Sequence, residues 1–216
     1  IINGTGAVSA GAGNVTVAPS TAITVGIGTG TGNLSVSNAE IGAITTTGTI
    51  TIGDPAMASV VTVDEVAAGS KNLTITTNST INDADDTGDA IVTSGVLTLR
   101  SGGLIGNLGG AQGLNIDVGT FNLTQSGGSN VTVRDSGTNG GTLLGSVATG
   151  GGGNFNYTLA AGDLTVGTAS TTGNVTLAAS AGNITDDASD VVLDITANDV
   201  TLTANAAGKG VLANGG

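Results

Sequence analysis

Residues Gly173-Asn174-Val175-Thr176-Leu177 carry the pattern that decides the fold of this 216-residue chain. A glycine and a polar turn residue precede three residues that alternate apolar, polar and apolar. Variants of the pattern recur at 13–17, 32–36, 48–52, 71–75, 129–133, 153–157, 162–166 and 198–202. Alternation with period two predicts a strand that buries one face, and β-branched residues favour strands. The glycine can supply the positive φ angle of a sharp turn.

The spacing of these short strands indicates how they assemble. Most copies lie roughly 16 to 24 residues apart, and minor apolar runs often lie about 7 to 11 residues apart. Tight hairpins in a sandwich or barrel could produce the smaller spacing. A β-solenoid explains more, because stacked equivalent strands need only small aliphatic side chains inside. We therefore predict an all-β fold, a right-handed parallel β-helix of about ten coils of roughly 20 residues. It is expected to run as one continuous segment over residues 1–216.

The composition fits a solenoid better than a globular core or a disordered chain. Glycine makes up 39 of the 216 residues, charged residues 9% and aromatic residues only 1%. The aromatic residues are Phe121, Phe155 and Tyr157, and we expect Phe155 and Tyr157 to face inward. Hydrophobic residues still reach 38% and fall in alternating clusters, which disorder does not require.

Charge and missing residue types exclude several function classes. Four basic residues against 16 acidic ones give a net charge of −12, which argues against binding nucleic acid or anionic membranes. No run approaches about 18 apolar residues, so we expect no membrane insertion. Cysteine and histidine are absent, which removes thiolate chemistry and the commonest general base. We predict no catalytic residues, no enzymatic activity and no required cofactor.

The sequence also contains a repeat that is longer than one coil. Segments 73–75, 81–86 and 97–99 correspond in order to 175–177, 184–190 and 200–202. The offset of about a hundred residues predicts two super-repeats, approximately 73–174 and 175–216, the second continuing beyond the chain. We expect the sequence to be an excerpt of a longer protein.

Residues 173–177, 182–186 and 198–202 resemble the repeat regions of filamentous-haemagglutinin-like exoproteins, as does the segment 97–106. The resemblance implies a right-handed β-helical rod that is exported and displayed at the bacterial cell surface. We therefore expect an extracellular structural or adhesive segment, such as an adhesin stalk, surface filament or sheath. Its partners would be neighbouring repeats or other copies of itself, through end-to-end or lateral contacts. Cell-surface glycans or receptors would bind through regions outside this chain.

The alternative function is a carbohydrate-binding or carbohydrate-degrading β-helix, such as a lyase or tailspike fragment. The adjacent pairs Asp85-Asp86 and Asp186-Asp187 could supply the two carboxylates that glycoside cleavage needs. The chain offers almost no basic or aromatic residues to hold a sugar, which argues against this reading. An ice-binding solenoid would need regular outward Thr-x-Thr rows, and Thr45–Thr47 and Thr76-Thr77 are too irregular for that.

Two sets of residues are candidate sites. Calcium prefers carboxylate and carbonyl oxygens, which makes candidates of Asp83, Asp85, Asp86, Asp89, Asp186, Asp187 and Asp190. The closing bidentate glutamate of a calcium loop is missing, so solvated, turn-forming aspartates are the reading we favour. Asn-x-Ser/Thr motifs mark glycan acceptors at Asn14, Asn33, Asn72, Asn122, Asn130, Asn156, Asn174 and Asn183. A corner asparagine before an outward threonine creates the same motif without any glycan.

Overall fold

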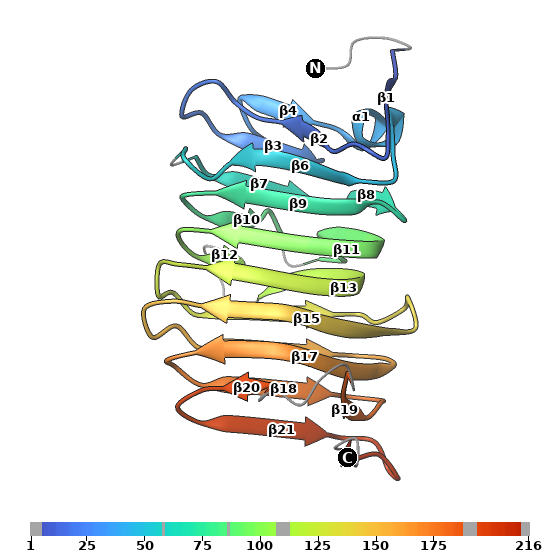
Figure 1. The fold of residues 1–216 in the computed structure, drawn as a ribbon, viewed down its shortest axis with the longest axis vertical. Coiled ribbons are helices and arrows are strands. Elements are labelled where there is room, and N and C mark those ends of the chain that lie inside the picture. Colours follow the sequence, from blue (N-terminus) through green and yellow to red (C-terminus); the bar gives the residue numbers. More distant parts are fainter. Residues whose placement is uncertain (1–5, 58, 86, 107–112, 188–193, 213–216) are drawn as a thin grey trace.

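The computed structural model describes residues 6–57, 59–85, 87–106, 113–187 and 194–212. They form a parallel β-solenoid of about six turns with a repeat of about 24 residues. Figure 1 shows the turns stacked along one axis in sequence order, from the blue end to the red end. The predicted parallel solenoid is therefore confirmed. The turns are longer and fewer than the predicted ten coils of roughly 20 residues. The reason is that several neighbouring short strands, which the sequence spacing suggested were in separate coils, belong to the same turn.

The pairings arrange the strands in three parallel columns. Column one contains β2 (Val15–Val17), β6 (Thr49–Asp54), β9 (Asn72–Thr77), β20 (Ile195–Thr196) and the second parts of β11 (Ile91–Ser101), β13 (Leu114–Gln125), β15 (Gly141–Thr149) and β17 (Asp163–Thr171). In register, this column aligns Val17, Ile52, Ile75, Leu99, Leu123, Val147, Ala169 and Ile195.

Column two lies on the next side of the coil. It contains β4 (Leu34–Val36), β3 (Val25–Gly28), β7 (Val61–Asp64), β10 (Ile81–Asp83), β12 (Ile105–Gly106), β14 (Val131–Asp135), β16 (Phe155–Leu159), β18 (Val175–Ala179) and β21 (Val200–Ala204). Column three contains β8 (Val66–Gly69), β19 (Ile184–Asp186), β22 (Val211–Leu212) and the first parts of the long strands of column one.

The long strands bend where column three leads into column one. Gly119 lies at this bend in β13, and a Cβ atom there would come within 2.4 Å of the carbonyl oxygen of Ser94 in the preceding turn. Only a residue without a side chain lets the two backbones approach so closely. The glycine-rich composition therefore reflects contacts between turns.

The N-terminal turn is wider than the others. Between β4 and β5 (Ile44–Thr46) it contains the helix α1 (Asn38–Ala43), and β5 pairs with β1 (Val8–Gly11) in a separate small sheet. Ser37 and Glu40 form a capping box, in which each side chain binds the backbone N–H of the other residue. The all-β prediction missed this helix, because its single turn is too short for a helical period. In the described residues, no helix is long and apolar enough to cross a membrane.

The core is a continuous stack of aliphatic side chains inside the three columns. The predicted inward positions of Phe155 and Tyr157 are confirmed, since both are fully buried, and Phe121 is buried beside them. The Tyr157 ring centroid lies 5.6 Å from that of Phe121 and 6.1 Å from that of Phe155, distances typical of favourable aromatic packing.

The super-repeat stays a prediction. Residues Leu73–Ile75 of its first copy lie in column one, on β9, whereas residues Val175–Leu177 of the second lie in column two, on β18. Residues with matching sequence therefore occupy different sides of the coil.

Candidate functional site

The corner between columns one and two carries neutral polar side chains inside the rod, which we call the neutral corner. Its aligned and buried members are Thr77, Ser101, Gln125, Thr149 and Thr171. The Thr171 hydroxyl donates to the carbonyl oxygen of Gly153 in the preceding turn, at 2.6 Å, and accepts from the N–H of Gly173, at 2.9 Å. One hydroxyl therefore stabilises the local bend at its own corner and connects this turn of the solenoid to the preceding one.

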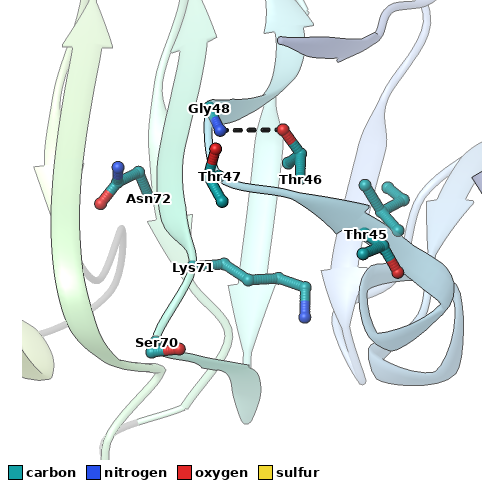
Figure 2. A pocket seen from close by; sticks show the side chains of 8 residues that line it. Thr45, Thr46, Thr47, Gly48, Ser70, Lys71 and Asn72 are labelled. Carbon is teal, nitrogen blue, oxygen red and sulfur yellow. Dashed lines mark hydrogen bonds between the residues drawn. The ribbon is translucent and has the colours of Figure 1, made fainter. Parts of the chain in front are cut away.

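Figure 2 shows a related corner, where column three leads into column one. The Thr46 hydroxyl accepts a hydrogen bond from the N–H of Gly48, at 2.9 Å, and donates to the carbonyl oxygen of Gly13. The side chain of Lys71 reaches across the same hollow, which has a volume of about 170 Å³. The polar lining of this hollow consists mainly of corner residues whose side chains already form hydrogen bonds with backbone groups.

Several predicted glycosylation sites coincide with corner asparagines. The Asn72 side-chain oxygen accepts from the N–H of Val96, at 3.0 Å, and that of Asn122 from the N–H of Ser146, at 2.8 Å. The Oδ1 atoms of further candidates are bonded to the next turn or a nearby strand, at Asn14, Asn33, Asn130, Asn174 and Asn183. Asn156 lies half-buried on β16. Glycosylation itself stays a prediction, and the structure assigns most of these side chains a role in the coil.

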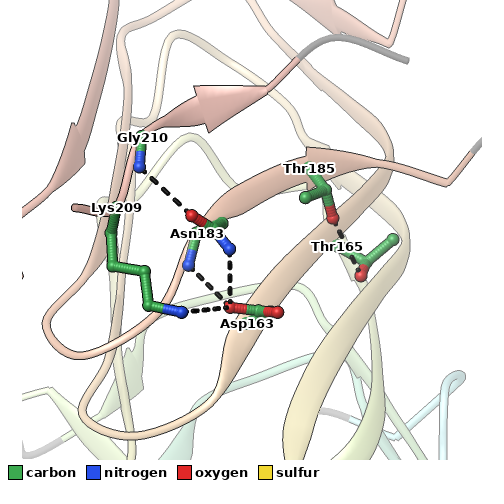
Figure 3. Close-up of polar contacts among 6 residues, drawn as sticks. All are labelled: Asp163, Thr165, Asn183, Thr185, Lys209 and Gly210. Atoms are coloured by element: carbon green, nitrogen blue, oxygen red, sulfur yellow. Dashed lines mark hydrogen bonds and ion pairs between the residues drawn. The ribbon is translucent and has the colours of Figure 1, made fainter.

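Figure 3 shows such a connection across three turns. The Asp163 carboxylate accepts from the N–H of Asn183, at 2.7 Å, and the Asn183 side-chain oxygen accepts from the N–H of Gly210, at 3.2 Å. Lys209 lies 4.0 Å from the same carboxylate, in an exposed ion pair that contributes little to stability. The hydroxyls of Thr165 and Thr185 share a hydrogen bond of 3.2 Å between adjacent turns.

Carboxylates gather instead where column two leads into column three. We call this the acidic corner, and its members are Asp83, Asp89, Asp117 and Asp135. Three of them are buried, and Asp89 is partly exposed. Asp89 accepts from the Ser136 hydroxyl, at 3.0 Å, and Asp117 accepts from the Thr138 hydroxyl. Loops of successive turns are thus joined through their carboxylates.

Asp83 has a strongly perturbed carboxyl group. Burial above all, and to a smaller extent the negative charges of Asp85 and Asp64, raise its pKa from the ordinary 3.8 to about 6. Backbone hydrogen bonds from Asn115 and Asp85 act in the opposite direction. On the exposed side of the same loop, hydrogen bonds from Thr87 lower the pKa of Asp85.

Asp135 occupies the centre of the acidic corner. Its carboxylate accepts from the Tyr157 hydroxyl at 2.5 Å, the Thr142 hydroxyl at 2.7 Å and the N–H of Gly137 at 2.9 Å. Burial raises the pKa of Asp135, although these bonds partly offset the effect. Burial together with the nearby Asp135 charge raises the pKa of Tyr157 well above its ordinary value. Tyr157 is thus both a core aromatic and a polar partner.

The predicted calcium ligands do not converge. Asp83 is buried on β10, whereas Asp85 is exposed and its carboxylate binds Thr87. Asp186 and Asp187 lie half-buried at and just after the end of β19. Asp86 and Asp190 lie outside the described residues. Among described residues, no group of three or more acidic side chains is placed to hold a metal ion, and calcium binding stays a prediction.

Sequence reasoning missed the buried carboxylates Asp117 and Asp135. The inward position of Asp135 could have been predicted from the sequence. It lies two residues after Val133 and four after Val131, so it faces the same side of the strand as these apolar residues. The hydroxyl groups at the corners could also have been predicted from the sequence. Their pattern is a threonine two residues before a glycine, as in Thr93-Ser94-Gly95 and Thr171-Thr172-Gly173, where the glycine N–H donates to the threonine hydroxyl.

Comparison of the chain with protein-family models, curated proteins and solved structures found no match. The fold and its corners therefore carry the functional argument.

Proposed function

We propose that this chain is a stiff structural segment of an extracellular repeat protein, serving as an adhesin stalk, surface filament or sheath. The observation that supports this most is the continuous alignment of column one, which runs from Val17 to Ile195 through seven successive strand pairings. Each turn adds one strand spacing of roughly 4.8 Å to the rod. Length and stiffness then follow from the number of turns.

The corner bonds support a mechanical role. Thr171, Asn122 and Asp163 each join their own turn to an adjacent one through side-chain hydrogen bonds. Separation of two turns would break these bonds together with several backbone bonds in three columns. Such repeated nearest-neighbour contacts give solenoids stability without a globular core. The proposal includes right-handed winding, since parallel strands are nearly always connected with that hand.

The proposed partners are further turns, either of the same chain or of another copy. In the described residues, β21 pairs with β18 on one edge and has no strand partner on the other. Val200, Val211 and Leu212 of this last turn are about half exposed. Open edges of this kind pair with further strands. Surface localisation belongs to the same proposal and agrees with the resemblance to filamentous-haemagglutinin-like exoproteins.

A distance measurement tests the rod. The chain has no native cysteine, so spin labels can be attached through Thr16→Cys and Thr201→Cys, both at exposed positions. Removal of residues 97–120 deletes one turn, since Leu97 and Phe121 occupy equivalent positions. The mean label distance should shorten by about 4.8 Å, and a duplication of 97–120 should lengthen it equally. Unchanged distances in both variants would contradict the rod.

Detection on intact cells tests the extracellular role. Antibodies against the chain should label unpermeabilised producer cells and decorate surface filaments or a surface layer in electron micrographs. Antibodies against a cytoplasmic protein provide the control for cell integrity. Labelling that appears only after lysis would refute the surface proposal and leave the rod architecture unaffected.

A further inference from the structure

The outer face of column one carries two polar rows that sequence spacing did not reveal. One row aligns Thr16, Thr51, Thr74 and Thr98, and the next aligns Gly53, Thr76, Arg100 and Thr124. The turns that separate these residues differ in length, which hides their alignment in the sequence. The first row is regular, whereas a glycine and an arginine interrupt the second.

Gly53 contributes no side chain to the second row. Its φ of +101° lies in the left-handed region, and a Cβ atom there would lie 2.0 Å from the carbonyl oxygen of Thr76, so the two backbones are in close contact. Beside this contact lies a hollow of about 320 Å³, lined by Asn14, Thr49, Thr51, Pro55, Thr74, Thr76 and Arg100.

Thr76 has an unsatisfied hydroxyl at this hollow. The residue is only 3% exposed, and its Oγ1 atom has no hydrogen-bond partner. A buried hydroxyl left unpaired is energetically unfavourable. Thr76 also lines an adjoining hollow of about 200 Å³, together with Pro55 and Arg100. A ligand group that enters between Pro55 and Arg100 would supply the missing partner.

Arg100 places a positive charge beside this hydroxyl. It is one of only four basic residues in the chain, is exposed, and forms no ion pair with any residue that the structure describes. The carboxylate of nearby Asp54 accepts from the N–H of Ala56, and Asp54 aligns with the inward Thr77 rather than with Arg100. A planar guanidinium with several donors suits a carboxylate.

We propose that this hollow, which we call the Arg100 hollow, binds an acidic saccharide unit of the uronic-acid type. Arg100 binds the carboxylate, Thr76 bonds a ring or hydroxyl oxygen, and the half-buried hydroxyls of Thr49, Thr51 and Thr74 bond further sugar hydroxyls. The combination of one cation with several hydroxyls favours this ligand over a simple anion or a neutral sugar. The site is independent of the stalk proposal, because it uses the outer face and leaves the core and corners unchanged.

Calorimetric titration of the full chain with trigalacturonate at low salt tests the proposal. The R100Q variant should weaken binding by about tenfold or more, since it removes the charge that binds the carboxylate. The T76V variant should weaken it about three- to tenfold while its melting temperature stays equal or rises, because valine removes an unpaired buried polar atom. R134Q is the matched control, because Arg134 is an exposed arginine on the outer face of β14 in column two.

Three results would overturn the proposal. They are no binding at millimolar trigalacturonate, equal weakening by R100Q and R134Q, and unchanged binding in T76V. Two ligand controls define the chemistry: maltotriose should not bind, and sulfate should not displace the trisaccharide at comparable concentration. If sulfate binds as tightly as trigalacturonate, the hollow is a general anion site, and the proposal of a saccharide ligand is refuted. None of these results bears on the label-distance test of the rod.

Discussion

The neutral corner and the acidic corner meet the same structural requirement with different chemistry. Each bends the chain between two columns and must provide partners for backbone groups that leave the strand ladder. The neutral corner uses hydroxyl and amide groups such as Thr171 and Gln125, whereas the acidic corner uses carboxylates such as Asp83 and Asp135. Stability of the first should not depend on pH, while stability of the second should. We therefore expect the acidic corner, and not the neutral corner, to make the stability of the rod depend on pH.

The largest expected effect comes from Asp135→Ala in the acidic corner. The substitution leaves the Tyr157 hydroxyl and the Gly137 N–H without their acceptor, and it leaves the Thr142 hydroxyl only the longer contact to the Val118 carbonyl oxygen, at 3.2 Å. We expect the free energy of unfolding to fall by about 3 kcal/mol or more, measured by denaturant titration. Thr158→Ala, on the exposed face of β16, should change it by less than about 0.5 kcal/mol. Equal effects of the two would show that Asp135 is not a structural centre.

The next effect is a dependence of stability on pH. A carboxyl with a raised folded-state pKa binds its proton at higher pH than in the unfolded chain. For Asp83, with values of 3.8 and about 6, stability is greatest below the lower value and is lost as the pH rises through the upper one. Raised pKa values of Asp89 and Asp135 act in the same direction. Unfolding free energies should therefore be roughly 1–3 kcal/mol larger at pH 4 than at pH 7.

The variant Asp83→Asn separates this effect from general charge repulsion. It keeps an oxygen acceptor for the Asn115 N–H and removes the titrating charge. The slope of stability against pH between 4 and 7 should become flatter. Asp199→Asn, which removes an exposed carboxylate from the last turns, should leave most of the slope in place. If both variants flatten it equally, the net charge of −12 rather than the acidic corner controls the response.

A smaller, pH-independent effect is expected in the neutral corner from Thr171→Val. Valine preserves the shape but removes the bonds to the Gly153 carbonyl and the Gly173 N–H. We expect a loss of about 1–2 kcal/mol that is the same at pH 4 and pH 7. Thr172→Val, at the adjacent exposed position, is the matched control. A loss that varies with pH would remove the distinction between the two corners.

The smallest effect is expected at the half-buried corner asparagine Asn122. Asn122→Ala removes the acceptor for the Ser146 N–H and should cost about 0.5–1 kcal/mol. Asn122→Asp keeps a side-chain oxygen and should recover most of that loss. Thermal unfolding of the two variants measures the difference. If aspartate is no better than alanine, the corner bond contributes nothing to stability.

Local sequence was sufficient to predict the strands and their inward residues. The alternation around Val15, Leu73 and Val175 identifies buried positions, because side chains on a strand face opposite sides in turn. The same period places Phe155 and Tyr157 inside. The capping box of α1 was also readable from Ser37 and Glu40, although six residues are too few to indicate a helix by periodicity.

The candidate sites were less predictable, since each depends on residues from different turns. The sequence brings Asp85 and Asp86 together as neighbours, yet the carboxylates that interact are those of Asp117 with Asp89 and Asp135. Corner asparagines were visible as glycosylation motifs, but not as acceptors for the following turn.

The amino-acid sequence by itself determined the short parallel strands, the aliphatic core and the glycine-rich turns, because these depend on neighbours within a few residues. Only the tertiary structure decided the length of each turn, the three columns, and which polar residues face each other across them. Register between turns depends on variable loops, as the different spacing of Thr16, Thr51 and Thr74 illustrates. The Arg100 hollow and the acidic corner exist only once those loops have set the register.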